Sequence, residues 1–92
     1  MPIEVRIPTI LRSYTGGAKS VPGSGATVGE LLADLDSRHP GLGDRIADGS
    51  GVRRFVNVYL NDEDVRFLGG LETPVSEGDT VTVLPAVAGG RR

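Results

Sequence analysis

TVGELLADL, residues 27–35, is the stretch of this chain that decides its fold. Thr27 and Glu30 have the spacing of a capping box, in which each side chain satisfies an unpaired amide at a helix start. The apolar residues recur at i, i+3, i+4 and i+7, which places them on one helix face: Val28, Leu31, Leu32 and Leu35. The sequence therefore predicts an amphipathic helix that begins at Val28 and stops at Pro40-Gly41.

Two strand patterns precede this helix. Residues 3–7 alternate apolar and polar positions, which is typical of a half-buried strand. Pro8 removes a backbone donor, so we expect the strand to fray there or to leave that position unpaired. Residues 13–17 have the composition of a turn and residues 18–21 that of a short returning strand. The sequence predicts an amino-terminal hairpin.

The chain after the helix carries the remaining strands. Leu42 and Ile46 can anchor one further helical turn before a flexible loop at residues 48–51. Strand patterns follow at residues 55–60, 65–67 and 80–84, separated by a polar turn at 61–64 and a tight turn at 77–79. This order predicts an α+β fold in which a mixed sheet of four to five strands packs on one main helix.

Composition narrows the class of protein. The chain has 92 residues, 38% hydrophobic and 24% charged, which is typical of one small folded domain. Its net charge of −2 lacks the basic excess that nucleic-acid binding requires. The absence of cysteine excludes disulfides, thiolate metal ligands and thiol nucleophiles. No apolar run has the length of a signal segment or a membrane span, so we expect a cytoplasmic monomer without membrane contact.

The side chains that could support catalysis have simpler structural roles. Asp62, Glu63 and Asp64 suit a solvated hairpin tip and lack the spacing of a calcium loop. His39, the only histidine, lies at a predicted helix end, and it is the one base available to any serine nucleophile. Residues 23–27 lack the lysine and the spacing of a phosphate-binding loop. We therefore expect this chain to have no catalytic side chain and no metal site.

The carboxyl-terminal sequence is the remaining candidate for chemistry. Gly89-Gly90 follows the last apolar strand pattern, and only Arg91-Arg92 come after it. Fourteen glycines in 92 residues predict about two adjacent pairs by chance, so the position of this pair matters more than its existence. Glycine lacks a Cβ atom, which lets an extended end enter a narrow active site. We divide the chain into a domain with an extended stem, residues 1–88, and a flexible tail, residues 89–92.

Residues 78–90, GDTVTVLPAVAGG, resemble the ubiquitin-like sulfur carriers of the ThiS and MoaD type. The turn, last strand, proline and diglycine of that family occur at this spacing. Four further segments are similar to the CysO branch, which supplies sulfide for cysteine synthesis: residues 7–12, 54–59, 61–67 and 85–90. The resemblance spans essentially the whole chain. It implies a ubiquitin-like β-grasp domain that is a carrier and not an enzyme.

The resemblance also implies partners. A ubiquitin-activating-type enzyme would use ATP to adenylate Gly90, and a sulfur donor would displace AMP to leave a thiocarboxylate. A cysteine synthase with pyridoxal phosphate would accept the sulfur, and a zinc metalloprotease would act on the tail. These cofactors belong to the partner enzymes, and the carrier itself would bind none. The tail residues that such partners would recognise are Val87, Ala88 and Gly89.

The residues after the diglycine are the one departure from the family pattern. Arg91-Arg92 place Gly90 in a peptide bond, so the encoded chain has no carboxylate there to adenylate. The metalloprotease would therefore have to cleave between Gly90 and Arg91, unless the dipeptide is an expression remnant or an inert tail. Two other functions remain open: the same chemistry serving thiamin, molybdopterin or a thio-containing natural product, and a noncatalytic ubiquitin-like binding module.

Strand alternation suggests a partner surface. If Val56 and Val58 face the helix, Phe55 and Tyr59 face outward, because alternate residues of a strand point to opposite faces. The two aromatic side chains could then form a docking patch on the open face of the sheet. Alternatively, they cover the sheet edge or pack under a loop.

Overall fold

The computed structural model describes residues 2–48 and 51–85. Its strands are β1 (Ile3–Arg6), β2 (Ser20–Gly23), β3 (Ala47–Asp48), β4 (Gly51–Val52), β5 (Val56–Leu60), β6 (Glu63–Asp64) and β7 (Thr80–Pro85). Its helices are α1 (Val28–Arg38) and α2 (Leu42–Ile46), with 3₁₀ helices η1 (Thr9–Thr15), η2 (Val65–Phe67) and η3 (Gly70–Glu72).

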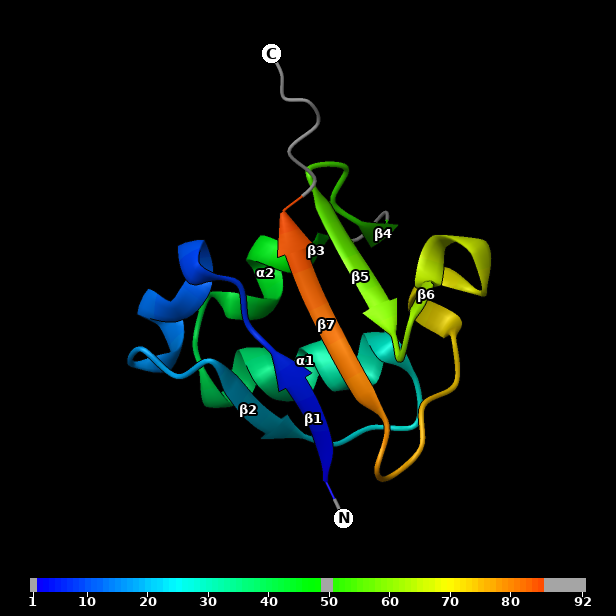
Figure 1. Cartoon of the computed structure of the whole chain (residues 1–92), viewed down its shortest axis with the longest axis horizontal. Coiled ribbons are helices and arrows are strands. Elements are labelled where there is room, and N and C mark those ends of the chain that lie inside the picture. The colour runs from blue at the N-terminus through cyan, green and yellow to red at the C-terminus, as the bar shows by residue number, and fades with distance from the viewer. Residues whose placement is uncertain (1, 49–50, 86–92) are drawn as a thin grey trace.

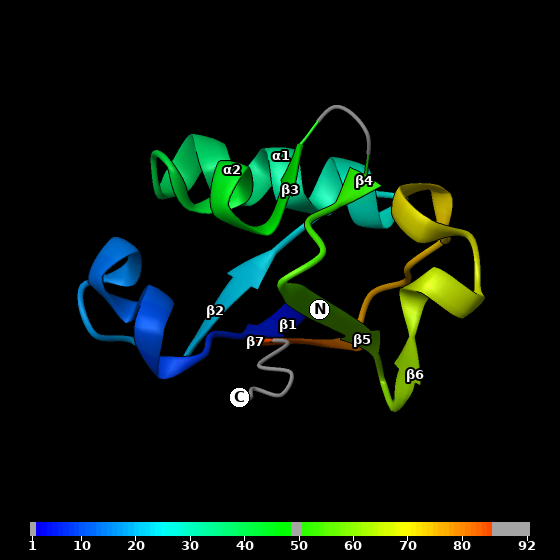
Figure 2. The same ribbon diagram turned by 90° about the horizontal axis from the view of Figure 1, so that it is seen from above.

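Five of these strands form one mixed sheet in the order β2-β1-β7-β5-β6. The central strand β7 runs parallel to β1 and antiparallel to β5. Figure 1 shows α1 behind this sheet, and Figure 2 shows the helices as a layer on one side of it. The predicted α+β architecture, a mixed sheet on one main helix, is confirmed, and it is the ubiquitin-like β-grasp arrangement.

The main helix begins at Val28, as predicted. Thr27 is the N-cap, and its hydroxyl oxygen accepts a hydrogen bond from the Glu30 backbone amide at 3.2 Å. The Glu30 carboxylate reaches back to the Ala26 amide at 3.0 Å, one residue earlier than a standard capping box would place it. The four apolar residues of the predicted stripe are all buried: Val28, Leu31, Leu32 and Leu35. The further turn anchored by Leu42 and Ile46 is also present, as α2.

The core lies between the helix layer and the inner face of the sheet. Val5, Val58 and Val81 are fully buried on the three central strands. Leu35 and Ile46 meet them from α1 and α2 and are buried to the same degree. Burial of branched apolar side chains from both layers holds the fold together, because each contributes roughly 1.5–3 kcal/mol when it leaves water.

Two predictions about the amino-terminal half are corrected. Residues 9–15, which include most of the predicted turn, form the 3₁₀ helix η1, and Gly16 ends it in the left-handed region with φ of 67°. The returning strand is shifted from residues 18–21 to Ser20–Gly23. Glycine at position 16 allows η1 to end in this way, because a residue without a Cβ atom adopts the left-handed conformation without steric penalty.

The segment at residues 65–67 was predicted to be a strand and is instead the 3₁₀ helix η2. The Asp64 carboxylate accepts a hydrogen bond from the Arg66 amide at 2.8 Å, which turns the chain after β6. The predicted loop at 48–51 is flanked by a short hairpin, since Ala47 pairs with Val52. The two central residues of that loop lie outside the described ranges.

Candidate functional site

The predicted reactive residues themselves lie beyond Pro85, outside the described residues. They are Val87, Ala88, Gly89, Gly90, Arg91 and Arg92. The division into residues 1–88 and 89–92 therefore stays a prediction. The structure does describe the base from which this segment starts, and that base forms the candidate site.

The base is the carboxyl end of the central strand β7. Leu84 lies opposite Asn57, and Pro85 lies opposite Val56 at the first position of β5. On its other side β7 pairs with β1 as far as Thr82, opposite Arg6. The reactive segment is thus attached to a strand that has a neighbour on each side. Figure 1 shows that β7 ends beside the start of β5.

Arg66, in η2, fixes the start of β5. Its guanidinium donates to the Asn57 side-chain oxygen at 2.7 Å and to the Arg53 carbonyl at 2.6 Å. It also donates to the Val56 carbonyl. Two of these acceptors belong to Val56 and Asn57, the residues that face the end of β7. Sequence reasoning missed this role because no local pattern links Arg66 to residues 9 to 13 positions earlier.

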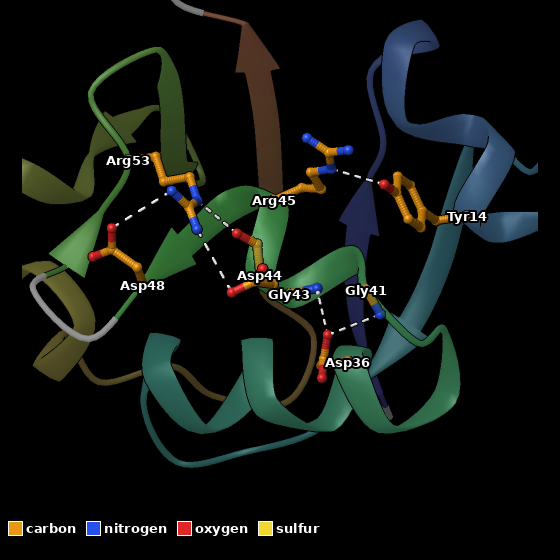
Figure 3. Close-up of polar contacts among 8 residues, drawn as sticks. All are labelled: Tyr14, Asp36, Gly41, Gly43, Asp44, Arg45, Asp48 and Arg53. Atoms are coloured by element: carbon orange, nitrogen blue, oxygen red, sulfur yellow. Dashed lines mark hydrogen bonds and ion pairs between the residues drawn. The ribbon is translucent and has the colours of Figure 1, made fainter.

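Arg53 ties the same segment to the helix layer (Figure 3). Its guanidinium lies 3.6 Å from a carboxylate oxygen of Asp44 and 3.6 Å from one of Asp48. Its backbone amide donates to the Ile46 carbonyl at 3.0 Å. Below this network in Figure 3, the Asp36 carboxylate accepts the amides of Gly41 and Gly43, both at 3.1 Å, and so joins α2 to α1.

Tyr14 and Arg45 join η1 to α2 near the same end of the sheet. The Arg45 guanidinium donates to the Tyr14 hydroxyl at 2.7 Å and lies 5.9 Å from the ring centre. This hydrogen bond raises the pKa of the Arg45 guanidinium, which therefore keeps its charge. A hollow of about 370 Å³ lies beside the pair. Its lining includes Arg53 and Phe55 as well as Tyr14 and Arg45.

The two aromatic residues of the predicted docking patch lie in different settings. Phe55 precedes β5 in a turn, is 62% exposed and lines that hollow beside α2. Tyr59 lies within β5, is half-buried and pairs with Thr82 and Asp64 in the sheet. The predicted alternation is confirmed at Val56 and Val58, which are buried. The patch itself stays a prediction.

The structure gives the other candidate residues structural roles. Asp64 caps η2, and Asp62 and Glu63 are exposed at the tip of the β5–β6 hairpin. His39 caps α1, with its amide donating to the Leu35 carbonyl at 2.7 Å. The Ser24 amide binds the Asp34 carboxylate at 3.1 Å, so an acidic group already occupies the loop that resembled an anion site.

The described residues contain neither a metal-binding cluster nor a membrane-spanning helix. Across residues 2–48 and 51–85, no three acidic or histidine side chains converge as a metal site would require. Within those ranges no helix combines the length and the apolar character that crossing a bilayer demands. The end of β7 therefore remains the candidate site.

Comparison with known proteins gives a consistent family. A family model described as "ThiS family" matches residues 5–90. The chain is 55% identical to the sulfur carrier protein CysO of Mycobacterium tuberculosis strain ATCC 25618 / H37Rv, over 98% of this chain and 100% of that protein. It is 37% identical to small archaeal modifier protein 3 of Haloferax volcanii, with the same two coverages. A chain in the crystal structure of the Amycolatopsis orientalis BexX/CysO complex is 59% identical and superposes with a TM-score of 0.89, covering 96% of this chain and 99% of that one.

Proposed function

This chain belongs to the ThiS family, and on that premise we propose that it is a sulfur carrier for cysteine biosynthesis rather than an enzyme. The observation that supports this most directly is the extent of the family match, which ends at Gly90 and leaves Arg91-Arg92 outside it. The end of the match supports Gly90 as the terminal residue of the processed carrier.

The proposed chemistry takes place on the Gly90 carboxylate and needs no side chain of the carrier. A protease first hydrolyses the peptide bond between Gly90 and Arg91. An adenylating partner then joins the carboxylate to the α-phosphate of ATP with loss of pyrophosphate, and a sulfide donor displaces AMP to leave the thiocarboxylate. The strand β7 supports this role because it holds the base of the tail while the tail extends into a partner.

The partner enzymes supply the cofactors in this proposal. Pyridoxal phosphate on a cysteine synthase would present an electrophilic carbon to the thiocarboxylate sulfur, and a zinc metalloprotease would carry out the tail cleavage. The narrow channels of these enzymes would enclose Gly89, Ala88 and Val87 of the carrier. We place the carrier in the cytoplasm as a monomer.

A second acceptor is favoured by one comparison. The 59% identical CysO chain of Amycolatopsis orientalis was crystallised in a complex with BexX. We propose that this carrier also binds a partner other than a cysteine synthase and delivers sulfur to it, such as an enzyme of thiamin, molybdopterin or natural-product synthesis. The carrier chemistry at Gly90 would be the same in each case.

Intact-protein mass spectrometry tests the proposal. A form that ends at Gly90 and the full-length chain are each incubated with ATP, sulfide and the adenylating enzyme of the same organism. The Gly90 form should gain about 16 Da, the difference between sulfur and oxygen, because the terminal carboxylate is the only reactive group. The full-length chain is the matched control and should gain nothing. A Gly90 form that stays unchanged would contradict the proposed function.

The processing step has its own test. Mass spectrometry of the protein isolated from its native host should find the chain without Arg91-Arg92. A carrier that stays full-length in the host while sulfur transfer proceeds would show that cleavage is not required.

A further inference from the structure

The two ends of the sheet carry opposite charge. The end from which the tail starts, here called the tail end, contains the residues after β1, before β2, before β5 and in α2. Its cationic side chains are Arg12, Lys19, Arg45, Arg53 and Arg54. The opposite end consists of the loops at residues 61–64 and 76–79. Its charged side chains are Asp62, Glu63, Asp64, Glu77 and Asp79, with no lysine or arginine in either loop.

The topology places these residues at their ends. The Ile7 amide donates a hydrogen bond to the Lys19 carbonyl oxygen at 2.8 Å, which puts Lys19 beside the carboxyl end of β1. Arg54 directly precedes β5, whose first residue faces Pro85. At the opposite end the Asn61 amide binds the Thr80 carbonyl at 2.7 Å, so the two acidic loops are neighbours. Figure 1 shows these loops at the end of β7 opposite to its carboxyl end.

Most of the positive charge at the tail end is available to a partner. Lys19, Arg45 and Arg54 are exposed. Two acidic side chains lie nearby: Asp44 and Asp48 both pair with Arg53, and Asp44 also interacts electrostatically with Arg45, so the five cations still outnumber them. In the described ranges no acidic side chain forms an ion pair with Lys19, Arg45 or Arg54.

Exposed apolar side chains accompany these cations. Leu84, 44% exposed, lines a hollow of about 300 Å³ together with Arg12 and Lys19. Phe55, 62% exposed, lines the hollow of about 370 Å³ together with Arg45. Each hollow also has one carboxylate in its lining, Glu4 in the first and Asp44 in the second, so each combines an apolar wall with a rim in which cations predominate. That is the composition of a protein interface rather than that of a nucleic-acid surface.

We propose that the tail end is an electrostatic docking surface for an acidic protein surface that surrounds the entrance receiving the tail. This inference rests on the proposed function, because it assigns a chemistry to the partner that accepts Gly90. Carboxylates of the partner face Lys19, Arg45 and Arg54, and its apolar side chains enter the two hollows. The acidic loops at the other end are repelled by the same surface, so the carrier approaches tail first. Charge arranged in this way raises the association rate more than the affinity.

A charge exchange between the two ends tests the proposal at constant net charge. The variant Lys19→Glu/Arg54→Glu/Asp62→Lys/Glu63→Lys keeps the net charge of the chain but removes the difference in charge between its two ends. Association of the Gly90 form with the adenylating enzyme of the same organism is followed by stopped flow. At about 20 mM salt the exchange should slow association at least about tenfold, and at about 500 mM salt the difference should shrink to about twofold.

Two double variants test the contribution of each end separately. Lys19→Gln/Arg54→Gln should slow association at low salt, whereas Asp62→Asn/Glu63→Gln should leave it equal to or faster than the parent. Neutral amides keep the size of the side chains, and circular dichroism establishes that each variant is folded. An exchanged variant that associates as fast as the parent, a parent rate that does not depend on salt, or a parent that does not bind the enzyme would each overturn the proposal. Thiocarboxylate formation without any effect of these charges would overturn it while leaving the proposed function intact.

Discussion

The guanidinium of Arg66 lies 2.7 Å from the side-chain oxygen of Asn57, nine residues earlier in the chain. Asn57 faces Leu84 across the sheet, one pair before the last described residue of β7. Arg66 therefore supports the base of the predicted reactive tail indirectly, through β5. It holds β5 in place, and β5 in turn holds the end of β7.

Replacing Arg66 with alanine should destabilise the fold. The substitution removes the donor to the Asn57 side chain and to the carbonyls of Arg53 and Val56. Hydrogen bonds from charged donors are worth about 1.5–3 kcal/mol, so urea titration should show a loss of that order in the free energy of unfolding. Arg66→Lys keeps one donor and should lose less. Equal stability of Arg66→Ala and the parent would show that water satisfies these acceptors.

The difference between Arg66 and Thr27 explains what the sequence could predict. Thr27 and Glu30 start α1 through contacts within a few residues, and such contacts leave a readable spacing. The contacts of Arg66 span up to 13 residues and depend on η2, whose residues have strand propensity. The hydrogen bond to the Asp64 carboxylate overrides that propensity, and no pattern in the sequence predicts this bond.

The candidate site likewise has one part that the sequence could predict and one part that it could not. The diglycine could be proposed as the reactive site from the sequence because main-chain chemistry needs only a contiguous motif. The hollow beside Tyr14, Arg45 and Phe55 could not, because it joins η1, α2 and the start of β5. These elements are distant in sequence and meet only once the sheet has formed.

Thr27→Ala should weaken the start of α1. The alanine leaves the Glu30 amide without its 3.2 Å acceptor, and loss of an N-cap costs about 1 kcal/mol. Thr27→Ser keeps the hydroxyl and is the matched control. Thermal unfolding of the three proteins compares them, and a Ser variant as destabilised as the Ala variant would assign the effect to the threonine methyl group instead.

Gly43→Ala should disturb the packing of α2 on α1. An added Cβ would lie 2.7 Å from the Leu32 carbonyl oxygen and 2.8 Å from the Asp36 Cβ. Overpacking of this kind costs about 1–3 kcal/mol, which urea titration can measure. Gly29→Ala is the control, because its Cβ would meet the Leu71 carbonyl oxygen at 3.2 Å and the helix gains from alanine. If Gly29→Ala proves the more costly of the two, the close approach at Gly43 is not a constraint.

Tyr59→Asp and Phe55→Asp test the aromatic docking patch separately. If both side chains contact the adenylating enzyme, each variant should weaken binding by about 2 kcal/mol or more, since buried aromatic residues dominate interfaces. Isothermal titration with the Gly90 form measures this. The two residues lie in different settings, so a loss of binding in Phe55→Asp alone would place the contact at the hollow beside Arg45. Unchanged affinity of Tyr59→Asp would remove Tyr59 from the interface.

Gly89→Val in the Gly90 form should abolish sulfur loading without unfolding the domain. A branched Cβ next to the terminal residue obstructs a narrow channel and displaces the carboxylate from the α-phosphate of ATP, and a displacement of about 1 Å can cost about 100-fold in rate. The initial rate of mass gain measures the effect, and an unchanged melting temperature shows that the domain is intact. Gly89→Ala adds a single methyl group and should retain more of the rate than Gly89→Val. Loading of Gly89→Val at the parent rate would mean that the partner does not enclose the diglycine, and the role of the glycines would then lie elsewhere.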